Sequence, residues 1–526
     1  MKNIIAIFLI SLLSFLSVKA QRTDLIYGAE KFTEKQGKYK LEILKNGNTA
    51  NVGINESVGF FCTLYDANKK IIAQTIVPVK FDINACALKS VFEINNDIFV
   101  MIVTANQNAP VLSRYIFDGT TGKLKKEELI ISGTAMTSSV MTTDQLADMI
   151  PPEFFVQKDP NSDYYAVAYF DYFSKDINKK ILVVHYSPTH GIISKAYLQN
   201  PAREFLNLHY VDMYVNGGIS IILSSYLYNI KDKKEACFYL SELKRGAVNF
   251  RNVRAVETDY YFNGQAMFVF NKVTNKLLLL SLIMGECEKG WIKSSVICQT
   301  VNMETLVLTD SIKIYSEKLD NNYMSLNSSN MHYPGLLQNY CITPKGNTII
   351  LSEDIFYDAG VAIPQRMAIS CLTPAGEDMY GEMIHYIHRL ASSPAALFYA
   401  KNSGKYTYGN NIDEFGKTYV GLIAGKTNCY LFLNNTPERF TMTETTQPSL
   451  WTPVSSSKEK FTSFIYTLND AGIVSKEYIF GVPATEAKYC RFNTADYDPE
   501  TGLYAVIVVE KIKGKKTASV LWLNLK

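Results

Sequence analysis

A recurring order of polar turn, apolar strand, polar loop and second strand most constrains what this chain can fold into. It is clearest in residues 159–187, DPNSDYYAVAYFDYFSKDINKKILVVHYS, and returns in residues 498–525, DPETGLYAVIVVEKIKGKKTASVLWLNL. Runs rich in β-branched and apolar residues, bounded by Asn, Asp, Gly and Pro, are typical of strands separated by turns. The sequence therefore predicts an all-β chain made of repeated antiparallel units.

Looser copies of this unit fill most of the chain. Their leading apolar runs are residues 97–104, 164–170, 218–224, 276–282, 347–352, 417–424 and 503–509. A second apolar strand follows each run, often with a turn and a further strand. Four short antiparallel strands, repeated about seven times, are the signature of a β-propeller. We therefore predict a single propeller of seven four-stranded blades, with eight as the alternative because residues 440–483 contain an extra hairpin.

The repeat also predicts how the chain is divided. Residues 1–20 are assigned to a signal peptide, 21–56 to an N-terminal leading segment and 57–526 to the propeller, with insertions at 316–335 and 440–458. The last unit shows about three strands, so a strand from the N-terminal end is expected to complete its sheet and leave no open edge.

The pattern resembles β-propeller repeat proteins at the level of architecture only. The sequence has no Trp-Asp dipeptide closing each unit, no kelch-type double glycine and no regular Asp-box. Since one fold serves many functions, this resemblance implies a fold and no particular activity.

The N-terminus predicts export. Lys2 precedes an apolar run over residues 4–18, and Val18-Lys19-Ala20 is a small-residue cleavage site, as in secretory signal peptides of bacterial type. We expect cleavage near Ala20 and a soluble periplasmic or extracellular protein. No later run approaches the 18 or so apolar residues of a membrane helix, so no integral membrane span is expected.

Net charge and cysteine content bear on the possible binding partners and on disulfide bonding. A formal net charge of +3 with interspersed signs gives no support for nucleic-acid binding, and it leaves the oligomeric state open. Most of the nine cysteines lie in apolar runs and are expected to be buried thiols. Cys287 and Cys298 flank a Gly-Trp pair in a predicted hairpin and form the one candidate disulfide.

The candidate ligand-binding residues come just after the leading strands, where equivalent loops emerge on one face of a ring. Aromatic rings beside carboxylates suit a sugar or a peptide, and the competing interpretation is that these rings pack between blades. The candidates are Asp171, Tyr172, Tyr226, Tyr228, Glu286, Trp291, Glu353, Asp354, Phe356 and Tyr357.

Two acidic turns resemble the first half of a calcium loop. Asp159-x-Asn161-x-Asp163 and Asp496-x-Asp498-x-Glu500 alternate oxygen ligands, but both lack the later Gly and Glu of such a loop. Structural turns are the favoured interpretation, and no metal or cofactor is predicted.

The leading functional hypothesis is an exported, non-catalytic binding or scaffold protein that recognises a glycan or another exported protein. The chain has no nucleophile elbow, no phosphate-binding loop and no zinc-protease motif. One alternative is a polysaccharide hydrolase or lyase with carboxylates near the propeller axis. Another is a structural module of an envelope assembly.

Overall fold

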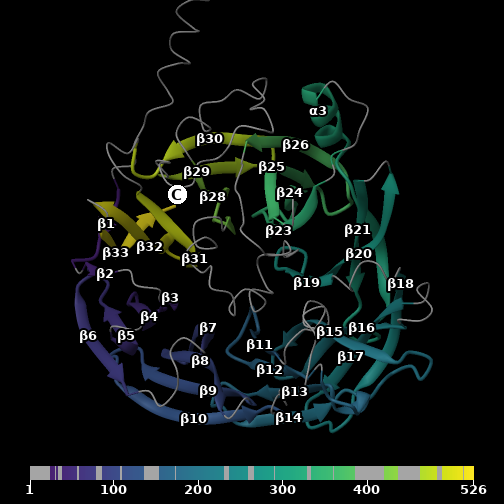
Figure 1. The fold of residues 1–526 in the computed structure, drawn as a ribbon, viewed down its shortest axis with the longest axis horizontal. Helices are drawn as coiled ribbons and strands as arrows, with labels where there is room; N and C mark the ends of the chain where they lie inside the picture. The colour runs from purple at the N-terminus through teal and green to yellow at the C-terminus, as the bar shows by residue number, and fades with distance from the viewer. Residues whose placement is uncertain are drawn as a thin grey trace, which may run out of the picture.

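The computed structural model of the chain is a closed ring of β-sheets around a central axis (Figure 1). Strands β3 (Lys38–Ile43), β7 (Ala87–Ile94), β11 (Glu153–Lys158) and β31 (Lys488–Asp498) lie toward the centre. Strands β6 (Ile71–Val77), β10 (Leu124–Ser132), β14 (Ile192–Tyr197) and β18 (Arg251–Thr258) lie at the rim. The structure describes residues 24–29, 31–33, 38–55, 58–78, 86–106, 109–134, 153–171, 173–229, 236–258, 266–288, 291–327, 333, 335–358, 361–385, 420–435, 462–481, 488–512 and 515–525. The predicted signal peptide lies outside them.

Six consecutive sheets share one four-stranded antiparallel plan. The first is β3 (Lys38–Ile43), β4 (Thr49–Asn55), β5 (Gly59–Tyr65) and β6 (Ile71–Val77). The second is β7 (Ala87–Ile94), β8 (Asp97–Asn106), β9 (Ala109–Asp118) and β10 (Leu124–Ser132). The third is β11 (Glu153–Lys158), β12 (Tyr165–Phe170), β13 (Ile181–Tyr186) and β14 (Ile192–Tyr197), with the short 3-10 helix η2 (Ile177–Lys179) before β13.

The next three sheets repeat the plan with longer central strands. The fourth is β15 (Asn207–Asn216), β16 (Ser220–Tyr228), β17 (Ala236–Lys244) and β18 (Arg251–Thr258). The fifth is β19 (Ala266–Asn271), β20 (Lys276–Glu288), β21 (Trp291–Val301) and β22 (Leu308–Ile314). The sixth is β23 (Leu336–Ile342), β24 (Thr348–Asp358), β25 (Val361–Leu372) and β26 (Asp378–His385).

A nine-stranded terminal sheet closes the ring. It contains β27 (Gly421–Ala424), β28 (Cys429–Asn435), β29 (Thr462–Asn469), β30 (Gly472–Tyr478), β31 (Lys488–Asp498), β32 (Leu503–Ile512), β33 (Lys515–Asn524), β1 (Ile26–Tyr27) and β2 (Phe32–Thr33). The predicted all-β propeller of antiparallel units is confirmed, and the ring has seven sheets. The terminal sheet consists of two meanders joined by one parallel bridge, Thr462 to Lys488, which is why the sequence also suggested an eighth unit.

N-terminal strands complete the last unit, as predicted. Both β1 and β2 pair antiparallel with β33, with Ile26 opposite Trp522 and Phe32 opposite Ala518. Trp522 is fully buried, and its indole Nε1 donates to Thr49 Oγ1 of the first sheet at 3.0 Å. The last strand is thus bonded to the N-terminal strands and to the next sheet, so the ring has no free edge at its closure.

The predicted boundary at residue 57 falls inside the first sheet and is corrected to Lys38, where β3 begins. The reason is β4, whose sequence TANVGIN has few strand-forming residues although all seven are buried. Gly53 is required there, because a Cβ atom would lie 2.4 Å from the ring of Phe61.

The core consists of apolar layers between neighbouring sheets. Phe238 and Leu240 of β17, for example, pack with Phe268 and Leu279 of the next sheet. Central strands are covered on both faces, so β12 is buried throughout its length and appears in the sequence as the continuous apolar run YAVAYF.

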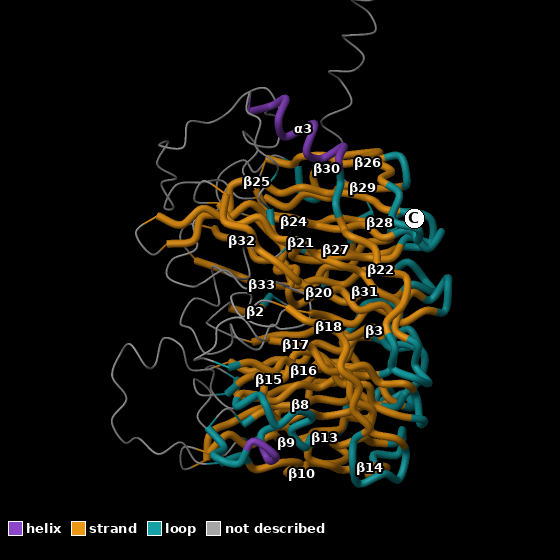
Figure 2. Tube along the Cα trace, turned by 90° about the vertical axis from the view of Figure 1, so that its right-hand side faces the viewer, coloured by secondary structure: helices purple, strands orange, loops and turns teal. Residues whose placement is uncertain are grey.

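The predicted insertion at 316–335 contains the helix α3 (Glu317–Asn327), which lies on the outer strand β26 (Figure 2). Ser316 Oγ accepts the Leu319 backbone N–H at 3.0 Å and caps the helix. Leu319 and Tyr323 are buried against Met383 and its neighbours. The helix therefore covers a sheet edge. The insertion at 440–458 lies outside the described residues.

Candidate functional site

The predicted ligand-binding residues belong to four sheets, and most of them lie within strands that run further than the sequence predicted. Several of them serve the fold. Asp171 is buried, and its carboxylate accepts the Phe173 backbone N–H at 3.1 Å and the Thr134 hydroxyl at 2.7 Å. This carboxylate fixes the loop after β12 to the end of β10. It is therefore a turn-forming group in this structure.

Tyr226 and Glu353 are also buried. Tyr226 packs on Phe238, with ring centroids 5.5 Å apart, and on the half-buried Tyr228, at 5.3 Å. Glu353 is fully buried in β24, opposite Leu336. Packing between sheets, the competing interpretation of these aromatic residues, describes Tyr226 better than ligand binding does.

The remaining predicted residues lie on two long hairpins. Glu286 pairs with Lys293 and Trp291 with Glu288 in the β20–β21 hairpin. Asp354, Phe356 and Tyr357 lie in β24 of the β24–β25 hairpin. Tyr172 and the side chains of these five residues lie outside the described part of the chain, so their role in binding stays a prediction.

The predicted disulfide between Cys287 and Cys298 is wrong. The two residues lie on adjacent strands, but Cys287 is opposite Ile292 and Cys298 is opposite Leu280. Six residues along the strand separate Cys298 from Ile292, or about 20 Å, whereas a disulfide spans Cα atoms about 7 Å apart at most. Cys298 is a free thiol.

Acidic side chains on the first strands join neighbouring sheets. Asp212 of β15 accepts Gln157 Nε2 of β11 at 3.1 Å and the Phe268 backbone N–H of β19 at 2.8 Å. Asp496 of β31 likewise accepts the Ile43 backbone N–H of β3 at 2.6 Å. These carboxylates bind backbone and amide donors of adjacent sheets.

Glu42 of β3 continues this series. Its carboxylate accepts the Glu93 backbone N–H of β7 at 2.8 Å. Burial, followed by the nearby charge of Asp496, raises the pKa of Glu42 well above its usual range. Glu42 therefore has a structural role, because its buried carboxyl group is hydrogen-bonded to the next sheet.

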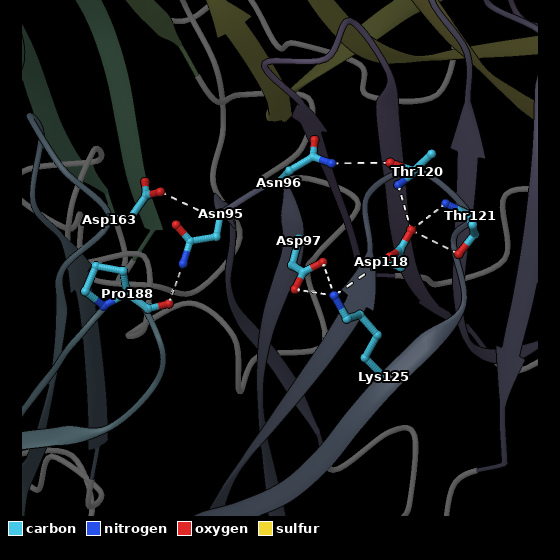
Figure 3. Close-up of polar contacts among 9 residues, drawn as sticks. All are labelled: Asn95, Asn96, Asp97, Asp118, Thr120, Thr121, Lys125, Asp163 and Pro188. Atoms are coloured by element: carbon cyan, nitrogen blue, oxygen red, sulfur yellow. Dashed lines mark hydrogen bonds and ion pairs between the residues drawn. The ribbon is translucent and has the colours of Figure 1, made fainter.

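The acidic turn before β12 is also structural (Figure 3). Asp163 accepts the Asn95 backbone N–H of the second sheet at 3.0 Å and forms an ion pair with Lys158 at 2.8 Å. Asn95 Nδ2 donates to the Pro188 carbonyl at 2.9 Å. Within the described residues, no group of three or more potential ligands could hold a metal ion.

The same network extends through the turns of the second sheet (Figure 3). Lys125 forms ion pairs with Asp97 at 2.8 Å and Asp118 at 3.7 Å, and Asp118 accepts the Thr121 backbone N–H at 2.7 Å. Asn96 donates to Thr120 Oγ1 at 3.3 Å. These contacts join the turns within the second sheet, and Asn95 joins them to the third sheet.

A pocket of about 380 Å³ opens between the fifth and sixth sheets at the tight-turn end of the ring. We call it the inter-sheet pocket. Its floor is apolar and includes Leu278 of β20, Ile312 and Ile314 of β22, and Leu372 of β25. Its other lining residues are Asn271, Thr274, Lys276, Cys298, Thr300, Asp310, Thr348, Thr373, Pro374, Ala375 and Gly376.

One ion pair marks the rim of the inter-sheet pocket. Lys276 Nζ lies 3.5 Å from Asp310 Oδ2, and both side chains are about half exposed. The lining includes four threonines, and no aromatic ring is found among its described residues. The site thus combines an apolar floor, polar groups that can bond to amides, and one charge of each sign.

The inter-sheet pocket exists because the apolar layer between these two sheets is incomplete. Met267, Leu280 and Ile350 are fully buried in that layer, but Leu278, Cys298 and Ile314 at its edge are only partly buried. Burial raises the pKa of the Cys298 thiol to about 11. The turn after β25 approaches closely at Gly376, which has φ of +86°.

Sequence reasoning did not find this pocket. Its residues come from two tight turns and six strands of two sheets, each of which is an ordinary connector or strand on its own. The alternation in β20, where Leu277 and Leu279 face one layer and Leu278 and Leu280 the other, is the one local sign.

Comparisons with known proteins support no assignment narrower than the β-propeller fold. No family model and no curated protein matches the chain. Among solved structures, prolyl oligopeptidase B from Galerina marginata is 10% identical over 92% of this chain and 54% of that chain, with a TM-score of 0.39. A post-proline cleaving enzyme from Rickettsia typhi is 10% identical over 90% of this chain and 57% of that chain, with a TM-score of 0.39. The chain thus spans about half the length of these two enzymes.

Another similar solved structure is an isolated β-propeller domain. The β-propeller domain of Nup133 from Vanderwaltozyma polyspora is 9% identical and covers 83% of this chain and 100% of that chain, with a TM-score of 0.37. The strand topology itself defines the chain as a β-propeller protein.

No helix in the described part of the chain is long and apolar enough to cross a membrane.

Proposed function

We propose that this chain is an exported, non-catalytic binding protein that holds a peptide segment of an exported protein partner in the inter-sheet pocket. The observation that carries the proposal is the pocket itself, about 380 Å³ with an apolar floor and a polar rim. That volume lies within the range of sites that enclose a ligand group.

The lining favours a peptide over a sugar. Sugar sites commonly present an aromatic ring to the CH face of the ligand, and the described lining contains none. An apolar side chain of a peptide would instead cover Leu278, Ile312 and Ile314. Its flanking amides would face the threonine hydroxyls, and a charged neighbour would meet Lys276 or Asp310.

The lining also favours binding over hydrolysis. Glycoside cleavage requires two carboxyl groups about 5 to 10 Å apart. Asp310 is the one carboxylate among the described residues of the pocket, and it is paired with Lys276. Glu42, Asp212 and Asp496 are committed to contacts between sheets.

The test is a selection followed by a matched pair of variants. The immobilised chain is panned against a phage-displayed random peptide library, and an oligosaccharide panel is screened in parallel by thermal shift. Selected peptides are then measured against Ala375→Trp, which places an indole at the rim. Ala67→Trp, an exposed alanine in the corresponding turn of the first sheet, is the control.

We expect Ala375→Trp to weaken peptide binding by about tenfold or more, with Ala67→Trp unchanged. Equal binding by both variants would show that the peptide binds elsewhere. A panel in which oligosaccharides alone bind would contradict the peptide class and favour a glycan ligand.

A further inference from the structure

A second pocket lies on the other face of the sixth sheet, where that sheet packs against the meander β27–β30. It has a volume of about 330 Å³, and we call it the Asp470 pocket. The turns β23–β24, β27–β28 and β29–β30 form it. Leu468 and Cys429 of its lining are fully buried, and most of the remaining lining residues are polar.

The Asp470 pocket and the inter-sheet pocket open at the same end of the ring. Each is lined by turns that join the first to the second strand, or the third to the fourth strand, of a sheet. In a four-stranded antiparallel meander these two turns lie at one end. Neighbouring sheets are also bonded there, since Asn271 Nδ2 of β19 donates to the Gly346 carbonyl of the β23–β24 turn at 3.0 Å. One ligand can therefore reach both pockets from one side of the molecule.

Consecutive residues of the sixth sheet separate the two pockets. Thr348, the first residue of β24, lines the inter-sheet pocket. Asn347, the residue before it, donates from Nδ2 to Asp470 Oδ1 of the other pocket at 2.9 Å. The wall between the pockets is therefore one sheet thick. Because packed sheets lie about 10 Å apart, the pocket centres are also about 10 Å apart, a distance that about three residues of an extended peptide cover.

The charge that the Asp470 pocket offers to a ligand is positive. Lys345 Nζ lies 2.9 Å from Asp470 Oδ2, and with the bond from Asn347 both oxygens of this carboxylate have a donor. The Asp470 side chain is only 17% exposed, whereas that of Lys345 is 79% exposed. An ammonium group has three N–H donors, so those of Lys345 that are not directed at Asp470 are available to a carboxylate from outside.

We propose that the peptide held in the inter-sheet pocket extends across the end of the sixth sheet and places an acidic side chain against Lys345 in the Asp470 pocket. This inference rests on the proposed function and defines the sequence class of the peptide. An apolar side chain covers Leu278 and Ile312, and an aspartate or glutamate follows or precedes it by about three residues. A charge-assisted hydrogen bond is stronger than a neutral one, so the lysine selects a carboxylate over an amide.

The test exchanges the charges on the two sides of this contact. A phage-selected peptide is synthesised with glutamate, glutamine or lysine at its acidic position. Each form is titrated by calorimetry against the wild-type chain, Lys345→Glu and Lys45→Glu. Lys45 is the matched control, because it lies in the equivalent turn of the first sheet, is 73% exposed and pairs with Asp163 at 3.7 Å.

We expect Lys345→Glu to bind the glutamate peptide about tenfold more weakly than the wild-type chain does. The same variant should bind the lysine peptide more tightly than the wild-type chain does, and a gain of affinity cannot come from misfolding. Lys45→Glu should leave the affinities for all three peptides unchanged. In the wild-type chain, the glutamine peptide should bind more weakly than the glutamate peptide.

The outcomes separate this inference from the proposed function. Selected peptides that lose affinity on Ala375→Trp but have no acidic residue near the apolar one would overturn the inference alone. Equal affinities of Lys345→Glu and the wild-type chain for the glutamate peptide would do the same. Selected peptides that bind Ala375→Trp as tightly as the wild-type chain would overturn both, because the inter-sheet pocket would then not be their site.

Discussion

The layer between the third and fourth sheets is filled, whereas the layer between the fifth and sixth sheets is open at its outer edge. In the first, Phe205 and Leu223 are fully buried in a core that runs across both sheets. In the second, Leu278 and Ile314 are partly buried and line the inter-sheet pocket. The comparison indicates that a repeated architecture supplies stability at most of its interfaces and can leave one free for binding.

The largest expected difference between the two layers is in how much free energy of unfolding is lost when a leucine is truncated to alanine. Leu223→Ala should lower the free energy of unfolding by about 3 kcal/mol, because it leaves a cavity in a filled core. Leu278→Ala should cost about 1 kcal/mol or less, because its side chain already borders an open pocket. Urea unfolding of both variants checks this, and equal costs would contradict the contrast.

The filled layer should also be the more sensitive to acid. His185 is fully buried, and its Nε2 lies 2.9 Å from the Gly217 carbonyl of the fourth sheet. Burial is the main cause that lowers its pKa from 6.5 to about 4. The folded state therefore excludes a proton that the unfolded state binds.

The sign of the pH dependence follows from this shift. The stabilisation is fully present above pH 6.5 and is lost as the pH falls toward 4, with a total change of up to about 3 kcal/mol. His185→Gln should flatten that part of the profile of unfolding free energy against pH. A profile unchanged by the substitution would show that other groups cause the acid sensitivity.

A smaller effect is expected at the rim of the inter-sheet pocket. Gly376 has φ of +86°, and a Cβ atom there would lie 2.3 Å from Ile312 Cγ2. Gly376→Ala should therefore destabilise the chain by about 2 kcal/mol and push the turn away from β22. Gly246→Ala, with φ of +73° but open space around its Cβ position, is the control for backbone strain alone. Equal losses in both variants would mean that the contact with Ile312 contributes nothing.

The sequence predicted the repeated strands well, because strands such as β12 are covered on both faces and appear as continuous apolar runs. It missed β4, whose buried Asn and Gly residues resemble a loop. It placed Asp171 and Tyr226 in a binding site because both come after apolar runs. Asp171 is instead hydrogen-bonded within the fold, and Tyr226 is buried inside a strand. No local pattern could reveal the inter-sheet pocket, since it arises from the spacing of two sheets.

The central claim is that the inter-sheet pocket binds a peptide, and Cys298 offers a direct test of it. Among the eight cysteines whose side chains the structure describes, Cys298 is the one that is not fully buried, and it lines the pocket. The rate of its alkylation by iodoacetamide is measured by peptide mass spectrometry with and without a selected peptide. We expect saturating peptide to slow alkylation of Cys298 by about tenfold or more, and a peptide that binds tightly yet leaves this rate unchanged would contradict the account.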